Sequence, residues 1–466
     1  MNKNDLLQQV RGSITNFEPL DENNLLKVAE EGLTMEEVRL AFERAGLNAS
    51  KIIVDPSRMI YNVYYADYDK GLYFDVYLTR EHLTDPRIGP AAVILERQHR
   101  TDFLKERDWD NFYFRDVPTP LRIYDFQKRV YDIEPEQVYK VWSFIHRNID
   151  YANSQWKDDI LDYVFDHAPK PDLPALNDNG LITIYRGAGK LSQPPGKAIS
   201  WSSNKKNALW FANHSGLGQA LYEAEVAPEN VVAYYSGFQN ENEVIIRRNS
   251  VLNIRKAVMI PVSQEKMNEL LAPALSELLH FGKYVAQFGY ERERVFDFHG
   301  QGHILRVLLL ALIYYYKSDT LLTQRDKRIL LYFSLLHDIG RSNDDADNRH
   351  GENSVTVIMQ NKISIPRLEL GKKDLDMAHL IIRYHCLPDK DGYAAIAAIK
   401  KYSSNDIERL KQLYQICKDI DGLDRVRLND LDVDQLRTEY AKKLPLVAGA
   451  LLQVNIEQFV NNTKNI

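Results

Sequence analysis

The sequence predicts a multidomain α+β protein, and three observations support this fold class. The chain has 466 residues, and a domain usually has roughly 100–200, so two or three domains are expected. Apolar runs that alternate with polar residues fill the stretch from about 180 to 258 and predict short β-strands. From about 275 to 440 apolar residues recur at helical spacing, which predicts an all-α region.

The composition is that of an ordinary soluble protein, with 44% hydrophobic and 27% charged residues. The net charge of −6 argues against a broad nucleic-acid-binding surface, though not against a local one. Cys386 and Cys417 are the only cysteines, and they do not form a metal-type pair. The most apolar run, Ile304 to Tyr316, is shorter than the ~20 residues of a membrane span, and no signal peptide begins the chain. We expect no membrane span, and a protein that is cytoplasmic or secreted into another cell without a cleavable signal peptide.

The first part of the chain mixes helical patterns with aromatic-rich alternation. Residues 59–78 predict a hairpin with its turn at Asp69 to Gly71. Residues 138–165 predict a pair of helices, and the proline-rich stretch 168–180 ends this pair. The sequence therefore predicts four regions: an N-terminal α+β region at 1–150, a strand-rich domain at 151–260, a helical domain at 275–440, and a C-terminal helix or tail at 441–466.

An arginine stands at the end of the first predicted strand of the middle domain. Alternation in LITIYRG places Ile182, Ile184 and Arg186 on one face, and Gly187 relieves crowding beside them. Burying an unpaired arginine is costly, so Arg186 requires an anion or water. An ordinary ion pair is the structural explanation for such a residue.

Hydroxyls and carboxylates follow in two further motifs. Ser200, Ser202 and Ser203 lie where a strand gives way to a predicted helix, a position that also suits helix capping. In GFQNENEV, an extended backbone would place Glu241 and Glu243 on one side of the strand. Two like charges there are unfavourable unless a cation, a proton or a substrate separates them. A solvated charged turn is the structural explanation for this motif.

In this order the three motifs resemble the mono-ADP-ribosyltransferases of the Arg–Ser–Glu class, which carry an E-x-E turn. The resemblance covers roughly Gly180 to Ile254 and departs at Trp201, where the family usually has threonine. It implies a split β-sandwich with a helical lobe, which the first 150 residues would supply unless they recognise the target. It also implies NAD as substrate. A protein acceptor is favoured, and a nucleic acid or nucleotide is the alternative.

The resemblance gives each of these side chains a role. Glu243 would be the catalytic carboxylate beside the oxocarbenium-like ribose, and Ser200 would orient it. Arg186 would hold the pyrophosphate through charge-assisted hydrogen bonds. Glu241 would meet the acceptor, and a glutamate at this position favours arginine as the acceptor. The implied NAD-binding set is Arg186, Gly187, Ser200, Ser202, Phe238 and Glu243.

Histidines and aspartates recur at helix-like positions in the C-terminal domain. His303 opens an apolar helix, the pair His337–Asp338 follows another, and His350 and His385 add two imidazoles. A lone buried histidine is usually structural, whereas carboxylates buried beside several histidines have the composition of a divalent-metal site. The order H…HD…H…H…D resembles the HD-domain metal-dependent phosphohydrolases over roughly 290 to 430.

This second resemblance implies a phosphoester hydrolase that uses Mn, Mg, Fe, Zn or Ni. Asp421 is preferred to Asp419 because it lies beside GLDRVR, and Asp424 is expected to be structural. His299 lies outside the H-x-x-R-V signature that begins at His303. Arg341 and Lys418 are candidate phosphate contacts. The implied core ligands are His303, His337, Asp338 and Asp421, and the implied ligands of a second ion are His350 and His385.

Together the resemblances predict a bifunctional enzyme that transfers ADP-ribose from NAD and hydrolyses a phosphoester, with the ADP-ribosylated product as one candidate substrate. The alternative is an NAD glycohydrolase or NAD-binding module coupled to an HD nucleotide phosphohydrolase. The stretch around His385 lacks the HHE and GYP elements of enzymes that cleave cyclic-di-GMP. The paired acidic residues of alarmone hydrolases are also absent after His337–Asp338. The sequence leaves the phosphoester, the oligomeric state and the acceptor open.

Overall fold

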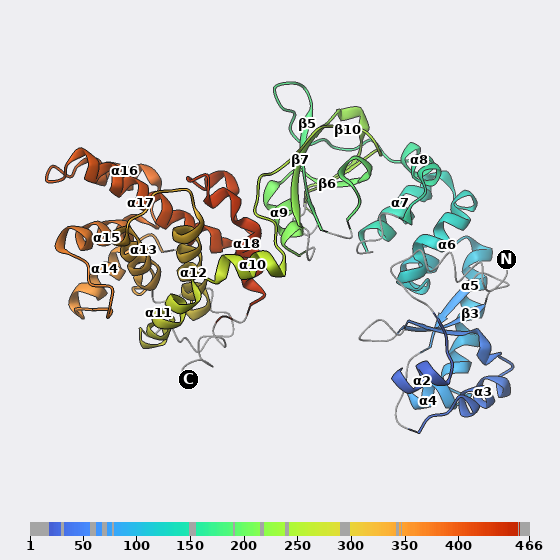
Figure 1. Ribbon diagram of the computed structural model, residues 1–466. Coiled ribbons are helices and arrows are strands. Elements are labelled where there is room, and N and C mark those ends of the chain that lie inside the picture. The colour runs from blue at the N-terminus through green and yellow to red at the C-terminus, as the bar shows by residue number, and fades with distance from the viewer. Residues whose placement is uncertain are drawn as a thin grey trace.

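In the computed structural model, an α+β N-terminal portion with two antiparallel sheets precedes an all-helical C-terminal region (Figure 1). This arrangement confirms the α+β prediction and the helical prediction for the C-terminal part. The structure describes residues 18–28, 32–55, 62–67, 72–76, 79–148, 155–189, 192–214, 219–237, 242–288, 299–341, 344–345, 347–454 and 456.

The first sheet has four antiparallel strands that follow one another in chain order. β3 and β4 form the predicted hairpin, with Asp67 opposite Leu72, and the predicted turn at Asp69–Gly71 lies outside the described residues. Buried side chains of the sheet and of the neighbouring helices share one hydrophobic core. The elements are β1 (Glu18–Pro19), α2 (Glu22–Val28), α3 (Met35–Arg44), β2 (Ile52–Asp55), β3 (Asn62–Asp67), β4 (Leu72–Asp75), α4 (Arg80–Thr84) and α5 (Gly89–Glu106).

Three helices connect the two sheets: α6 (Arg122–Arg129), α7 (Pro135–Arg147) and α8 (Asp158–Asp166). The last two are the predicted helical pair. Proline at the first position of α7 suits a helix start, because its missing N–H has no intrahelical partner there. Val138, Val141, Trp142 and Ile145 recur at helical spacing and are buried. They share their core with Ile245 of the second sheet, so α7 packs against that sheet.

The second sheet has six strands in the order β10-β7-β5-β6-β9-β8, and all its pairs are antiparallel. Five of the strands were predicted, and β10 was not. β5, β6 and β9 are neighbours, so the segments that carry Arg186, Ser200 and Glu243 lie side by side. The strands are β5 (Ile182–Ala188), β6 (Ser200–Ser202), β7 (Ala220–Val226), β8 (Val231–Tyr235), β9 (Glu243–Ile246) and β10 (Val251–Lys256).

Helix α9 (Lys205–His214) joins the second sheet to the helical region. On one side it packs against β5 so closely that a Cβ on Gly187 would lie 2.0 Å from the Ala208 carbonyl oxygen. This contact explains the glycine after Arg186. On the other side Leu209 and Ala212 belong to the hydrophobic core of the helical region.

The helical region is built around α12 and α13, most of whose side chains are buried. The apolar run that begins at Ile304 lies inside α12, as the sequence predicted. None of the helices in the described part of the chain is both long and apolar enough to span a membrane. The helices are α10 (Gln264–Leu271), α11 (Leu275–Gln287), α12 (Gln301–Lys317), α13 (Gln324–Leu336), α14 (His350–Gln360), α15 (Lys372–Tyr384), α16 (Asp389–Ala397), α17 (Ser404–Leu423) and α18 (Pro445–Leu452).

Candidate functional site

Five helices bring the six predicted metal ligands into one cluster in the helical region. One ligand lies in the first turns of α12, two directly follow α13, one opens α14, one directly follows α15, and one lies in the last turn of α17. The four imidazoles and the first aspartate are 5% exposed or less, and the side chain of the second aspartate is 30% exposed. In that order the six residues are His303, His337, Asp338, His350, His385 and Asp421.

The imidazoles form two pairs, and Asp338 lies between them. Nε2 of His303 is 3.2 Å from Nε2 of His337, and Nε2 of His350 is 2.9 Å from Nε2 of His385. Oδ2 of Asp338 lies 3.7 and 3.8 Å from the first pair, and its Oδ1 lies 3.3 and 3.7 Å from the second. Asp338 therefore offers one carboxylate oxygen to each pair.

Hydrogen bonds on the far side of two rings fix their tautomers. Nδ1 of His350 contacts the Asp347 carbonyl oxygen, and Nδ1 of His385 lies 2.6 Å from the Ile382 carbonyl oxygen. A carbonyl only accepts, so each Nδ1 carries the proton and each neutral Nε2 carries a lone pair. Two lone pairs that face each other at 2.9 Å repel unless a cation lies near both.

The donor set therefore fits a divalent metal. Imidazole nitrogens and carboxylate oxygens suit Zn, Fe, Ni and Mn, and a carboxylate with one oxygen on each imidazole pair suits two ions. Oδ1 of Asp338 is buried and has no hydrogen-bond partner among the described residues. A buried charged oxygen without a partner is costly, which a bound cation would relieve.

Asp424 supports the cluster from behind and is fully buried. Its Oδ2 lies 2.8 Å from Nδ1 of His303. Arg306 donates hydrogen bonds to both carboxylate oxygens of Asp424, to Oδ1 at 2.6 Å and to Oδ2 at 3.0 Å. A carboxylate behind a ligating histidine orients the ring and raises its basicity. The prediction that Asp424 is structural agrees with this placement. Asp419 contacts Arg437 and Thr438 instead, as expected from the preference for Asp421.

The protonation states also suit metal ligands. Burial lowers the pKa of His303 to about 4, and Arg427 adds to this. Burial together with the neighbouring His385 lowers the pKa of His350 to about 4. Burial opposes ionisation of Asp338, but the surrounding histidines outweigh it and hold the pKa of this carboxyl well below its usual range. At neutral pH His303 and His350 are therefore neutral and Asp338 is charged, which is the state in which such groups bind metal. His337 differs, because Asp338 and Asp421 outweigh its burial and raise its pKa.

A cavity of about 930 Å³ opens over the cluster and reaches Asp338, His350, His385 and Asp421. Its size is at the upper end of the ~300–1,000 Å³ range of small-molecule sites. His299 also lines it and contacts Asp344 at 2.9 Å. The cavity lining carries both signs of charge, since Asp389 forms ion pairs with two of its basic side chains and Asp430 with a third. The basic side chains are the groups that could contact an anion. They are Lys206, Arg341, Lys418, Arg425, Arg427 and Arg437, of which the first comes from α9.

A second group of predicted site residues meets on the second sheet. Oγ of Ser200 on β6 donates a hydrogen bond to Oε1 of Glu243 on β9 at 2.6 Å. Nη1 of Arg186 on β5 donates to the Ser200 carbonyl oxygen at 2.5 Å. Nε of Arg186 is buried without a hydrogen-bond partner among the described residues, and burial lowers the pKa of the guanidinium to about 10. A buried donor of this kind is available to an anion.

His146 completes this group, and the sequence interpretation missed it. It lies in the last turn of α7, stacks on Trp142 with ring centroids 4.9 Å apart, and its Nε2 is 3.0 Å from Oε1 of Glu243. Burial raises the pKa of Glu243, but His146 and Ser200 reverse this, so the net pKa is lowered. The only sequence signal was a histidine on the apolar face of a predicted helix, which is usually structural.

The remaining predicted nucleotide contacts have different positions. Ser202 is buried, and its Oγ accepts a hydrogen bond from the Asn204 backbone just before α9, as a helix-start serine does. Gly187 is where β5 packs on α9. Phe238 and Glu241 lie outside the described residues.

No protein-family model, curated protein or solved structure matches this chain.

Proposed function

We propose that the chain is a bifunctional enzyme. The helical region is proposed to be an HD-type metal-dependent phosphoester hydrolase. The second sheet, with the helices before it as its helical lobe, is proposed to be an ADP-ribosyltransferase-like split β-sandwich that uses NAD. The single observation that carries the hydrolase is the position of Asp338 between two imidazole pairs at a cavity whose lining includes basic side chains.

In the hydrolase site, Asp338, Asp421 and the four histidines would hold the divalent ions. When bound, such ions supply Lewis-acid chemistry that activates water and neutralises phosphate oxygens. Asp424 keeps the His303 ring in place, and the cavity cations bind and orient the phosphoester. Arg341, whose Nε lies 3.2 Å from Oδ2 of Asp338, is the cation placed closest to this carboxylate.

The hydrolase is tested with metal-stripped protein reconstituted with Mn, Mg, Fe, Zn or Ni in separate samples. Bis(p-nitrophenyl) phosphate and p-nitrophenyl phosphate serve as diester and monoester probes. We expect hydrolysis of at least one probe with at least one ion, and loss of that activity in the double variant His337→Ala, Asp338→Ala. Equal rates in the double variant and the wild type would refute the proposed site.

The transferase proposal is carried by the contact chain from Arg186 through Ser200 to Glu243. Arg186 would bind the pyrophosphate of NAD, and Glu243, held by Ser200, would stabilise the positive charge that develops on the ribose. The bond between ribose and nicotinamide breaks, and nicotinamide leaves with the electron pair. The acceptor then forms a bond to the same ribose carbon and loses a proton. A protein acceptor, with arginine favoured, belongs to this proposal.

Mass spectrometry of the protein incubated with NAD and cell lysate tests this second activity. We expect nicotinamide release and a modified acceptor, both abolished by Glu243→Gln. Nicotinamide release without a modified acceptor would favour an NAD glycohydrolase. Repeating the reaction with a metal chelator asks whether the two sites act in sequence. An acceptor mass that chelation leaves unchanged would refute processing of the ADP-ribosylated product by the helical region.

A further inference from the structure

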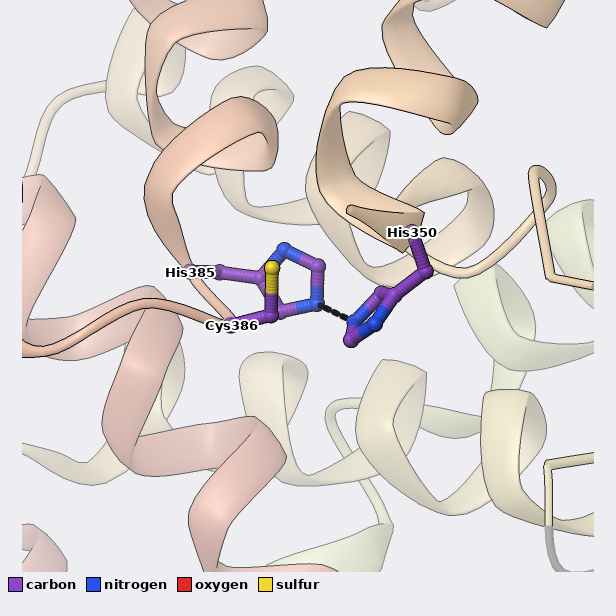
Figure 2. Close-up of side chains that lie close together, drawn as sticks. All are labelled: His350, His385 and Cys386. Carbon is purple, nitrogen blue, oxygen red and sulfur yellow. Dashed lines mark hydrogen bonds between the residues drawn. The ribbon is translucent and has the colours of Figure 1, made fainter. Parts of the chain in front are cut away.

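Cys386 lies beside the second imidazole pair, directly after His385 in the chain (Figure 2). Its Sγ and one ring nitrogen each of His350 and His385 all lie within 4.8 Å of one another. The thiol is partly exposed and lines the same cavity as the two histidines. Three groups that can bind a metal therefore lie close together beside the cavity.

The other contacts of the sulfur are weak or favour a thiolate. The S–H group points to the Asn348 carbonyl oxygen at 3.5 Å, a long and weak hydrogen bond. The backbone N–H of Gly351, in the first turn of α14, donates to the sulfur. Backbone N–H groups at the start of a helix stabilise a thiolate, which is the form that binds metals. Burial nevertheless raises the pKa of the Cys386 thiol, and the charge of Asp338 adds to this, so a bound cation would be needed to favour the thiolate.

The two halves of the cluster therefore differ in their donors. The first half has His303 and His337 with the carboxylate of Asp421, whose Oδ1 lies 3.5 and 3.6 Å from the two rings. The second half has His350 and His385 with the sulfur of Cys386. Asp338 offers one oxygen to each half. The first set is two nitrogens and two oxygens, and the second is two nitrogens, one oxygen and one sulfur.

We propose that Cys386 is a thiolate ligand of the ion held by His350 and His385, so that this half of the cluster selects zinc or another thiolate-binding ion. Four ligands with two imidazoles, one carboxylate and one thiolate match the tetrahedral coordination of Zn²⁺. Thiolate is a soft ligand that Mg²⁺ and Ca²⁺ avoid, so the second half rejects these ions. This inference rests on the metal centre of the proposed function.

Cobalt is the probe, because a Co²⁺ ion bound by thiolate has a sulfur-to-metal charge-transfer band in the near ultraviolet that nitrogen and oxygen ligands do not produce. The metal-stripped full-length chain is titrated with Co²⁺ while absorbance and bound metal are measured. We expect two bound ions per chain and the charge-transfer band in the wild type. Cys386→Ser should lose the band and one of the two ions.

Cys417→Ala is the matched control, because this second cysteine is fully buried in α17 and is not part of the clustered donor atoms. It should keep both ions and the band. Co²⁺ binding without a charge-transfer band in the wild type, or a band that persists in Cys386→Ser, would overturn the assignment of Cys386 and leave the hydrolase proposal standing. Failure of the wild type to bind any Co²⁺ would overturn the metal centre and this inference together.

Discussion

Nε2 of His146 lies 3.0 Å from Oε1 of Glu243, although the two residues are 97 positions apart in the chain. His146 ends α7, and the same helix contacts the second sheet through Ser143, whose Oγ lies 2.9 Å from the hydroxyl of Tyr235. The candidate nucleotide site is therefore completed by a helix from outside the sheet. A chain that begins after α7 would lack this contact.

His146 is expected to position Glu243 and to keep it ionised. In His146→Gln the carboxylate loses a partner that lowers its pKa, so the acidic limb of the pH–rate profile for NAD cleavage should move to higher pH. We expect kcat to fall by about 10- to 100-fold, in line with the loss of one positioning hydrogen bond. Nicotinamide release measured between pH 5 and 9 checks both effects. His167→Gln, directly after the neighbouring α8, is the control, and an unshifted profile in His146→Gln would contradict the positioning role.

Asp338 is expected to be required for both ions, because it offers one oxygen to each imidazole pair. Asp338→Asn keeps the shape of the side chain but removes its charge, and it should reduce the bound metal from two ions per chain to none or nearly none. Elemental analysis after dialysis measures this. His379→Gln serves as the control, because this histidine of α15 contacts Tyr332 and is not among the clustered donor atoms. A variant Asp338→Asn that retains both ions would refute the shared-carboxylate arrangement.

Low pH should lower the stability of the helical region, because it protonates Asp374 on α15. Its carboxylate accepts hydrogen bonds from Arg325 on α13 at 2.9 Å and from Arg409 on α17 at 2.8 Å. Burial raises the pKa of Asp374, but the two arginines outweigh burial and the net pKa is lowered. The unfolded chain, with an ordinary pKa near 3.9, therefore binds the proton first as pH falls. The stabilisation is full above about pH 4 and is lost as pH falls below it.

Asp374→Asn tests this dependence, because it breaks a buried ion pair and should cost roughly 3 kcal/mol at pH 7. The difference in the free energy of unfolding between variant and wild type should stay constant from pH 8 to 5 and become smaller below pH 4. Urea unfolding followed by circular dichroism measures it. Asp376→Asn, which removes only a surface pair with Lys401, should change stability by less than about 1 kcal/mol at every pH.

Gly187 should tolerate no side chain, since a Cβ there would lie 2.0 Å from the Ala208 carbonyl oxygen and 2.2 Å from the Ala212 backbone nitrogen. Gly187→Ala must push α9 away from β5 and should cost about 1–3 kcal/mol or more. A fall in the thermal unfolding midpoint checks this. Gly196→Ala is the control, because nothing lies within 4 Å of its added Cβ. Equal midpoints for the two variants would contradict the close packing of α9.

Local pattern was sufficient to predict the strands and helices that carry the site residues. Alternation predicted β5, and the apolar run from Ile304 predicted the buried helix α12. The resemblance to the Arg–Ser–Glu transferases predicted that Arg186, Ser200 and Glu243 would lie together, and neighbouring antiparallel strands bring them side by side. The single elements needed only the chain's own periodicity, whereas their grouping needed the resemblance.

Contacts between distant segments could not be predicted in the same way. His146 and Cys386 had no local signal that separates a ligand or positioning residue from an ordinary core residue. The shared position of Asp338 depends on how five helices pack, which no pattern within one helix specifies. β10 was missed because its apolar and polar residues do not alternate regularly, and five of its six residues are exposed.

Helix α9 gives the two candidate sites a mechanical connection. It begins three residues after Ser202 in β6, the strand whose first residue holds Glu243, and its Lys206 lines the cavity over the metal cluster. Helix α9 packs against β5 on one side and against the helical core on the other. A shift of either neighbour would therefore displace α9. A ligand that displaces β6 would thereby change the position of a positive charge at the other site. Two sites in domains joined only by a flexible linker would have no such route for allosteric communication.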